Sequence, residues 1–379
     1  MRYILILKGM SEYEVLDGFV DAICVGFKKL GYMVEIFDVK KDRIIRRQHY
    51  DMIFSFNGIA AAIFHHIPVD SDTLLWSFLV DHPYYLSDRV ESGVKNHIVS
   101  CVDLEHVDYM NRFHPDCVTS YFVPHGGETS KGTYIPYDER KYDVVFMGTL
   151  KSEKEYFEIL EKGPMEVKSI VCQIIDDAEH RDDFSLAEAV QLRISHLEDK
   201  ELKYAIAELS FIDTIIRSRN RKKIIDKLIE HDIKVHIFGN GWEEYSKKYS
   251  DKVIVHESVS YNEMLNLNMN SKIVLNNMPL FRNGSHERVF TAMLNGAVCV
   301  TEESKYLKTQ FVDDDDLVFF RMDDLDSMCS RIKEILNDSS KAISIAERGK
   351  EKALKSHTWE SRAKSILDFF EENCKTVKN

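Results

Sequence analysis

The sequence is poor in cysteine, proline and glycine. Its 379 residues include seven cysteines, seven prolines and sixteen glycines, and the cysteines form no C-x-x-C pair. We therefore expect neither a disulfide framework nor a structural zinc site. No apolar run approaches the roughly 18 residues that span a bilayer, and the apolar run 3–7 is too short for the core of a signal peptide. The expectation is a cytoplasmic protein without a membrane span.

Positive charge is also scarce. Lys and Arg number 50 against 63 Asp and Glu, so the formal net charge is −13. This balance argues against a surface that attracts polyphosphate in bulk, and we expect no nucleic-acid partner. A local anion site at helix ends remains compatible with it. Hydrophobic residues make up 44% of the chain, enough for buried cores, and the length favours two or three domains of roughly 150 residues each.

Short apolar segments alternate with helical patterns along the chain. This alternation predicts parallel sheets covered on both faces, and thus an α/β protein with two Rossmann-like domains and a ligand cleft between them. The first series of predicted strands is 3–7, 31–39, 51–58, 73–83, 96–102 and 120–127. The second series is 142–150, 233–245, 252–260, 271–279, 296–302 and 317–320.

A polar stretch at 128–141 is the predicted linker between the two series. The predicted domains are 1–135 and 136–356. Residues 151–230 contain almost no Gly or Pro and repeat apolar residues every three or four positions, which predicts a helical insertion in the second domain. The last segment, 357–379, is predicted as a closing helix with Thr358 as its N-cap.

The segment 283–304 carries the sharpest chemical pattern. A Gly–Ser turn precedes a helix whose first turn holds His286, Glu287 and Arg288. With Ser285 as N-cap, free backbone N–H groups at the helix start would suit a diphosphate. Arg288 could contact phosphate oxygens through two N–H groups. The simpler alternative is a capped helix whose Glu and Arg face solvent.

This segment resembles the donor-binding helix of GT-B glycosyltransferases, especially the CgeB-like, spore-maturation type. Those proteins carry an R-x-F-E-A-x-x-x-G-A pattern, which Arg288, Phe290, Ala292, Gly296 and Ala297 match. The resemblance implies the GT-B architecture of two Rossmann-like domains that face a cleft. Thr291 stands where the family usually has a glutamate that holds the donor ribose. Glu287, one turn earlier, is the candidate substitute.

The resemblance extends to three loops of the second domain. Segment 144–150 is similar to the first strand and glycine loop of the GT-B donor domain, and segment 236–245 to the next. The loop at 256–265 resembles the one that meets the nucleobase. The residues that the resemblance brings to the donor are Gly148, Thr149, Lys151, Gly239, Asn240, Gly241, Val259, Ser260 and Tyr261. The alternatives are an ordinary strand-to-helix turn at Gly148 and a surface aromatic at Tyr261.

Two short motifs end strands of the first domain. Asp81 and His82 follow an apolar strand directly, and polar groups at such a strand end commonly face the ligand crevice. His82 resembles in position the histidine of retaining GT-B enzymes, whereas Asp81 would suit a general base. His125, in a segment similar to the V-P-N-G motif of this fold, is the third catalytic candidate. The alternatives are a strand end without chemistry and a hinge with an incidental histidine.

Together these motifs predict a hexosyltransferase-like glycosyltransferase. It would move a sugar from a nucleotide-diphosphate donor, most simply a UDP-sugar, to a glycan or protein acceptor. We expect no metal requirement and no cofactor beyond this co-substrate, because no motif with metal-ligand spacing ends a strand. Two alternatives stay open, a sugar-nucleotide epimerase of the same architecture and a catalytically silent sugar-nucleotide-binding module.

Overall fold

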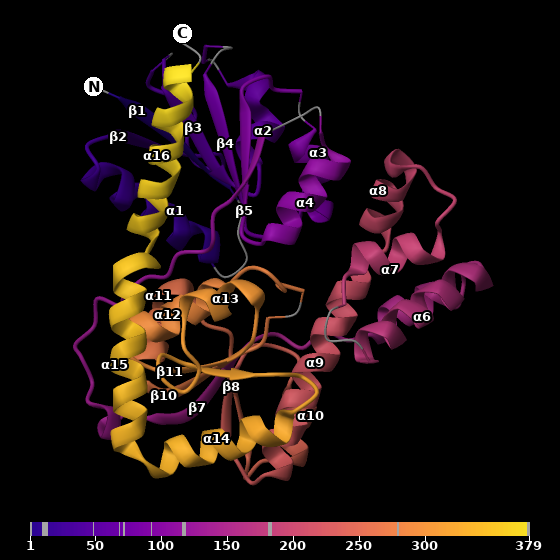
Figure 1. Ribbon diagram of the computed structural model, residues 1–379, viewed down its shortest axis with the longest axis vertical. Coiled ribbons are helices and arrows are strands. Elements are labelled where there is room, and N and C mark those ends of the chain that lie inside the picture. Colours follow the sequence, from indigo (N-terminus) through magenta and orange to yellow (C-terminus); the bar gives the residue numbers. More distant parts are fainter. Residues whose placement is uncertain are drawn as a thin grey trace.

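The chain folds into two α/β domains, each built on a six-stranded parallel sheet (Figure 1). The computed structural model describes residues 2–9, 14–47, 49–67, 69–70, 73–91, 93–115, 119–180, 184–278 and 280–376. Every strand of the two sheets overlaps a segment that the sequence predicts as a strand. The prediction of an α/β protein with two Rossmann-like domains is confirmed.

The N-terminal sheet has the strand order β2-β1-β3-β4-β5-β6, with all neighbours parallel. Its strands are β1 (Tyr3–Lys8), β2 (Met33–Asp38), β3 (Met52–Phe56), β4 (Leu74–Leu79), β5 (His97–Cys101) and β6 (Thr119–Phe122). Its helices are α1 (Val15–Lys29), α2 (Ile59–Ile63), α3 (Ser87–Val90) and α4 (Leu104–Phe113), with the short 3₁₀ turns η2 (Phe64–His66) and η3 (Pro83–Leu86).

The C-terminal sheet has the order β12-β11-β10-β7-β8-β9 and is also parallel. Its strands are β7 (Tyr142–Met147), β8 (Val235–Phe238), β9 (Val253–His256), β10 (Ser271–Asn276), β11 (Val298–Glu302) and β12 (Val318–Phe320). The helices around it include α10 (Glu243–Lys248), α11 (Tyr261–Met269), α12 (Glu287–Leu294), α13 (Lys305–Gln310), α14 (Leu325–Asn337) and α15 (Ser339–Ser356), and the turn η4 (Tyr137–Glu139) precedes β7.

The strand order reverses once in each sheet, between β1 and β3 and between β7 and β10. In open α/β sheets a ligand binds beyond the carboxyl ends of the strands, at such a reversal. The loops that follow β1, β3 and β4 meet those that follow β7, β8 and β9 around shared cavities. The fold thus places two switch points opposite each other.

The described residues of the segment 151–230 are mostly helical and reach from the C-terminal domain to the N-terminal one. The helices are α5 (Lys154–Leu160), α6 (Met165–His180), α7 (Leu186–Arg193), α8 (Asp199–Glu208) and α9 (Phe211–Glu230). The second half of α9 packs into the core of the C-terminal sheet through residues such as Ile224 and Leu228. Its first half joins a cluster with Tyr84 and Tyr109 of the N-terminal domain. Helix α8 contacts α4 and η3, and Figure 1 shows it on the α3–α4 side of the N-terminal domain.

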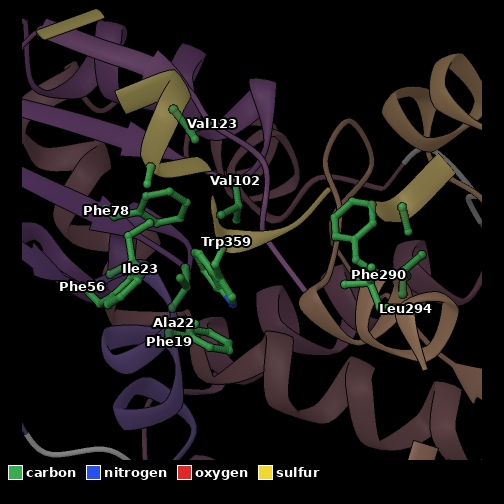
Figure 2. Close-up of a cluster of buried hydrophobic side chains, with 14 of the residues drawn as sticks. Phe19, Ala22, Ile23, Phe56, Phe78, Val102, Val123, Phe290, Leu294 and Trp359 are labelled. Carbon is green, nitrogen blue, oxygen red and sulfur yellow. The ribbon is translucent and has the colours of Figure 1, made fainter. Parts of the chain in front are cut away.

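The closing helix α16 (Trp359–Thr376) returns to the N-terminal domain and packs on α1. Thr358 caps it, since its Oγ1 accepts a hydrogen bond from Ser361 N at 3.1 Å, as predicted. Trp359 is 2% exposed and its ring lies 4.7 Å from Phe19 and 5.4 Å from Phe56. Figure 2 shows this tryptophan among aromatic side chains of the N-terminal domain. The end of the chain thereby ties the domains together.

Candidate functional site

Two adjoining cavities lie between the domains. The C-terminal cavity, of about 430 Å³, is lined mainly by loops after β7, β8 and β9 and by the start of α12. The N-terminal cavity, of about 630 Å³, is lined mainly by α1 and the loops after β1, β3 and β4. Five residues line both cavities: Val15, Asp81, Arg217, His286 and Glu287. Each volume falls in the range of small-molecule sites.

Most predicted donor residues come together in the C-terminal cavity. Those that line it are Gly148, Thr149, Lys151, Gly239, Val259, Tyr261, His286, Glu287 and Arg288. Five other predicted donor residues do not line this cavity: Asn240, Gly241, Ser260, Ser285 and Thr291. Sequence analysis missed Arg217 and Arg221, which lie on α9 within the predicted insertion, and Ser258, which precedes α11.

The glycine loops after β7 and β8 are joined by backbone hydrogen bonds. Gly148 N donates to Phe238 O at 3.0 Å, and Leu150 N donates to Asn240 O at 2.9 Å. Gly241 has φ of +85°, and a Cβ there would lie 2.0 Å from Leu150 O. Only glycine fits this close approach. Asn240 and Gly241 therefore shape the loop at Gly148 rather than contact the cavity.

Trp242 is fully buried, and its Nε1 donates to Gly148 O at 2.8 Å. Its ring lies at the edge of Phe146, on β7, at 6.1 Å. Packing of this kind fixes the glycine loop from behind. The tryptophan supports the cavity wall and does not line it.

The start of α12 is capped by His286, so the prediction of Ser285 as N-cap is wrong. His286 Nδ1 accepts a hydrogen bond from Arg288 N at 3.2 Å. Ser285 lies one residue too early, and its hydroxyl is buried without a hydrogen-bond partner among the described residues. An imidazole nitrogen with the right reach can replace a serine oxygen as acceptor for the first turn. The segment's sequence alone did not distinguish the two.

Four cationic side chains converge on the C-terminal cavity: Lys151, Arg217, Arg221 and Arg288. The Arg288 guanidinium donates through Nη1 to Met147 O, and Arg221 donates through Nη1 to Thr149 O. Both arginines are thereby held at the loop that follows β7. In a chain of net charge −13, such a cluster makes this cavity locally rich in positive charge.

The same burial disfavours the charged form of two of these arginines, although both stay charged at neutral pH. Burial, with the neighbouring charges of Arg288 and Arg217, lowers the pKa of Arg221 to about 9. Burial, followed by the charge of Arg217, lowers the pKa of Arg288 to about 10, although Glu287 opposes this shift. Cations that repel one another in a desolvated site favour a bound anion, because the anion relieves both effects.

Glu287 occupies the junction of the two cavities. It is 2% exposed, and burial raises its pKa to about 7, although the Thr291 hydrogen bond and the Arg288 charge both act to lower it. Thr291 is fully buried behind it and donates through Oγ1 to Glu287 Oε1. Glu287 therefore lines the cavity, whereas Thr291 does not line it and instead hydrogen-bonds the carboxyl group of Glu287. The alternative that Glu287 faces solvent is wrong.

The loop after β9 contributes an apolar wall. Ser260 caps α11 together with Glu263, as Ser260 N donates to Glu263 Oε2 at 2.9 Å. Val259 and Tyr261, on either side, line the cavity. Tyr261 is 3% exposed and packs at 5.5 Å on Phe19, so the alternative of a surface aromatic is wrong. This wall could border a planar ring system.

Asp81 is the predicted catalytic residue that reaches both cavities. Its Oδ2 accepts a hydrogen bond from Asn57 Nδ2 at 2.8 Å, and Asn57 Oδ1 accepts one from Val80 N at 2.9 Å. Asn57 therefore orients the carboxylate from the neighbouring strand end. Sequence analysis missed Asn57, although its position before Gly58 at the end of a strand was the available signal.

The two predicted catalytic histidines differ in position. His82 lines neither cavity, because its ring stacks on Tyr84 at 3.7 Å and faces His106 at 4.2 Å. His125 lines the N-terminal cavity. Burial, with the charges of Arg362 and Arg288, lowers the pKa of His125 to about 3. Burial and the nearby His106 hold the pKa of His82 well below its usual value. Both rings are therefore neutral and weakly basic.

Among the described residues, no group of three or more His, Cys, Asp or Glu side chains is placed to hold one metal ion. In the same part of the chain, no helix is both long and apolar enough to cross a membrane.

Comparisons with known proteins agree with this geometry. The sequence model of the family described as "Glycosyl transferase-like" matches residues 217–368. No curated protein matches the chain in sequence. The sucrose-phosphate synthase of Thermosynechococcus elongatus has a similar structure, with a TM-score of 0.60 and 10% identity over 99% of this chain and 100% of the other.

Two further solved structures are similar. HepE of Anabaena, in complex with UDP-glucose, has a TM-score of 0.57 and 11% identity over 98% of this chain and 100% of the other. An alpha-glucosyltransferase in complex with UDP-glucose and DNA has a TM-score of 0.59 and 11% identity over 97% and 99%. The chain therefore has the two-domain fold of GT-B glycosyltransferases, and over residues 217–368 it is similar to the glycosyl transferase-like family.

Proposed function

We propose that the protein is a glycosyltransferase that takes a hexose from a UDP-sugar. The observation that carries this proposal is the convergence of Lys151, Arg217, Arg221 and Arg288 on a cavity at the switch point of the C-terminal sheet. A diphosphate is opposite in charge to the four cations, and a glycine loop lets backbone N–H groups approach its oxygens. Leaving-group stabilisation by such fixed charges is a large part of catalysis in group transfer.

The uridine assignment rests on fold and on the cavity wall. HepE and the alpha-glucosyltransferase are both described with UDP-glucose. In this chain the base would lie against the wall of Val259 and Tyr261, beyond the cationic cluster. Glu287 would meet the ribose or the sugar hydroxyls, because its carboxyl sits where the cavities join. The CgeB-like subtype belongs to this proposal as well.

The N-terminal cavity would hold the acceptor, a glycan or protein group, with its hydroxyl beside Asp81. A carboxylate held by Asn57 can accept the proton from that hydroxyl. The neutral histidines are poor bases, so His125 is better suited to packing or to a hydrogen bond with the sugar. Residues 1–135 would serve the acceptor, residues 136–356 the donor, and the reaction would need no metal ion.

Calorimetric titration with UDP in EDTA tests the donor site. We expect binding in wild-type protein, with UDP preferred over other nucleoside diphosphates. Arg288→Ala should weaken binding by about 1–3 kcal/mol, since one charge-assisted contact is lost. The control is Arg348→Ala, which removes an exposed arginine of α15 that pairs with Asp315. Equal UDP affinities of wild type and Arg288→Ala would contradict the proposed site.

A further inference from the structure

Tyr85 of the N-terminal domain contacts α9 of the C-terminal domain. It lies in η3, directly after the segment that carries Asp81 and His82. Its hydroxyl oxygen is 2.8 Å from Asp213 Oδ2 and 3.1 Å from Ser210 O. This hydroxyl thus makes a polar contact between the N-terminal domain and α9.

Asp213 also binds Arg217, which lies one helical turn further along α9. Asp213 is 1% exposed. Its Oδ1 accepts from Arg217 Nε at 2.9 Å, and its Oδ2 lies 2.5 Å from Nη2. One edge of the guanidinium is therefore committed to Asp213. No partner of Nη1 is found in the described parts of the chain, while Arg217 lines both cavities.

The direction of its pKa shift distinguishes Arg217 from the other arginines that line the C-terminal cavity. Burial disfavours its cation, but the Asp213 carboxylate, together with Tyr85 and Tyr84, outweighs burial and raises the pKa of Arg217. Among the residues that the structure describes, no carboxylate lies at bonding distance from Arg221 or Arg288, and the pKa values of both arginines fall. Burial and Asp213 also raise the pKa of Tyr85, so its hydroxyl keeps its proton and donates. The Asp213 carboxylate therefore favours the charged form of Arg217 and fixes one edge of its guanidinium.

We propose that Tyr85 is a positioning residue, which orients Arg217 at the diphosphate through Asp213. The Tyr85 hydroxyl binds one oxygen of Asp213, and the carboxylate holds the guanidinium with its second edge toward the cavities. Binding is reciprocal, so a diphosphate on Arg217 also favours the Tyr85–Asp213 contact between the domains. This inference rests on the proposed function, because it assumes that the donor diphosphate binds Arg217.

A second interdomain contact of the same helical segment offers a matched control. Arg112 of α4 binds Asp199 of α8 at 2.7 Å and Gln191 of α7 at 2.8 Å. These side chains link the N-terminal domain to the helical segment as Tyr85 does, but they line neither cavity. Loss of this pair removes an interdomain contact without touching Arg217.

The experiment compares UDP affinity, by calorimetry, in wild type, Tyr85→Phe and Arg112→Ala. Tyr85→Phe keeps the ring and removes only the hydroxyl. We expect UDP affinity and the rate of UDP-glucose cleavage to fall about 3- to 10-fold, which is the loss of one hydrogen bond of ordinary strength. Arg112→Ala should change neither by more than about 2-fold.

A double-mutant cycle separates positioning from a general loss of structure. In Asp213→Asn the bidentate hold on Arg217 is gone, so adding Tyr85→Phe should lower UDP affinity by less than about 2-fold more. A purely structural role would give the same loss in both backgrounds. Wild-type affinity in Tyr85→Phe, or additive losses in the cycle, would overturn the positioning role and leave the proposed function standing. Absence of UDP binding in wild type would overturn both.

Discussion

At the scale of single residues, Glu287 is the group most sensitive to its surroundings. It is buried at the junction of two cavities and hydrogen-bonded by Thr291. Burial raises its pKa from the usual 4.5 to about 7. The carboxyl thus keeps a proton, in the folded protein, over a range where the unfolded chain has released it. The charge of this site therefore changes near neutral pH.

This shift predicts a pH-dependent cost of folding. Between pH 4.5 and 7 the folded state binds more protons at Glu287 than the unfolded state, so the stability contributed there is present below this window and falls as pH rises through it. Relative to wild type, Glu287→Gln should gain on the order of 3 kcal/mol in free energy of unfolding from pH 4.5 to 8. Urea unfolding of both proteins across this range measures the difference, and parallel curves would contradict the prediction.

Several residues of the candidate site could be predicted from the sequence, because the residues beside them in the chain indicate a helix start or a strand end. Arg288 follows the Gly–Ser turn of a helix start, and Asp81 ends an apolar strand. Arg217 and Arg221 could not be found this way, since they lie in a polar stretch of α9 that reads like any exposed helix face. His82 was misplaced because sequence shows that a ring follows a strand, but not that it turns onto Tyr84.

At the scale of elements, helix α16 is part of the core of the N-terminal domain, although it follows the C-terminal domain in the sequence. It starts at Trp359, whose ring contacts Phe19 of α1, Phe56 of β3 and Phe78 of β4. The helix then runs along α1, so a segment that follows the C-terminal domain completes the N-terminal core (Figure 2). A core built in this way makes the N-terminal domain depend on the end of the chain.

Trp359→Ala should therefore destabilise the protein strongly. Removing a buried tryptophan costs about 3–5 kcal/mol, from lost apolar burial and the cavity left behind. The control is Leu354→Ala on α15, where the side chain is 50% exposed and the cost should stay below about 1 kcal/mol. Thermal unfolding of the three proteins measures this contrast. Similar transition temperatures for wild type and Trp359→Ala would contradict the role of α16.

Element positions followed from the sequence more completely than element ends. Strand alternation predicted both sheets, because buried parallel strands are short apolar runs between helical patterns. The cap of α12 was assigned to Ser285 because serine is the commoner capping residue, whereas the fold uses His286. Such choices depend on which side chain the preceding loop turns toward the helix, and that loop is fixed by contacts such as Asn283 N with Asp103 Oδ2 at 2.9 Å.

At the scale of the whole molecule, the helical segment between β7 and β8 links the two domains on one side, and α16 links them on another (Figure 1). The cavities lie between these links, with cations on the C-terminal side and Asp81 on the N-terminal side. A donor and an acceptor would each bind one domain and meet at Asp81 and Glu287. This arrangement supplies orientation as well as charge for transfer.

The most direct test of this account is phosphorus NMR of UDP-hexoses incubated with the protein in EDTA. We predict conversion of one UDP-hexose to UDP, slowly with water and faster with an acceptor, and a much slower conversion by Asp81→Asn in a protein that still binds UDP. Bound but unconverted donor would identify a silent binding module. A new UDP-sugar with its sugar–phosphate bond intact would identify an epimerase, and either result would contradict glycosyl transfer.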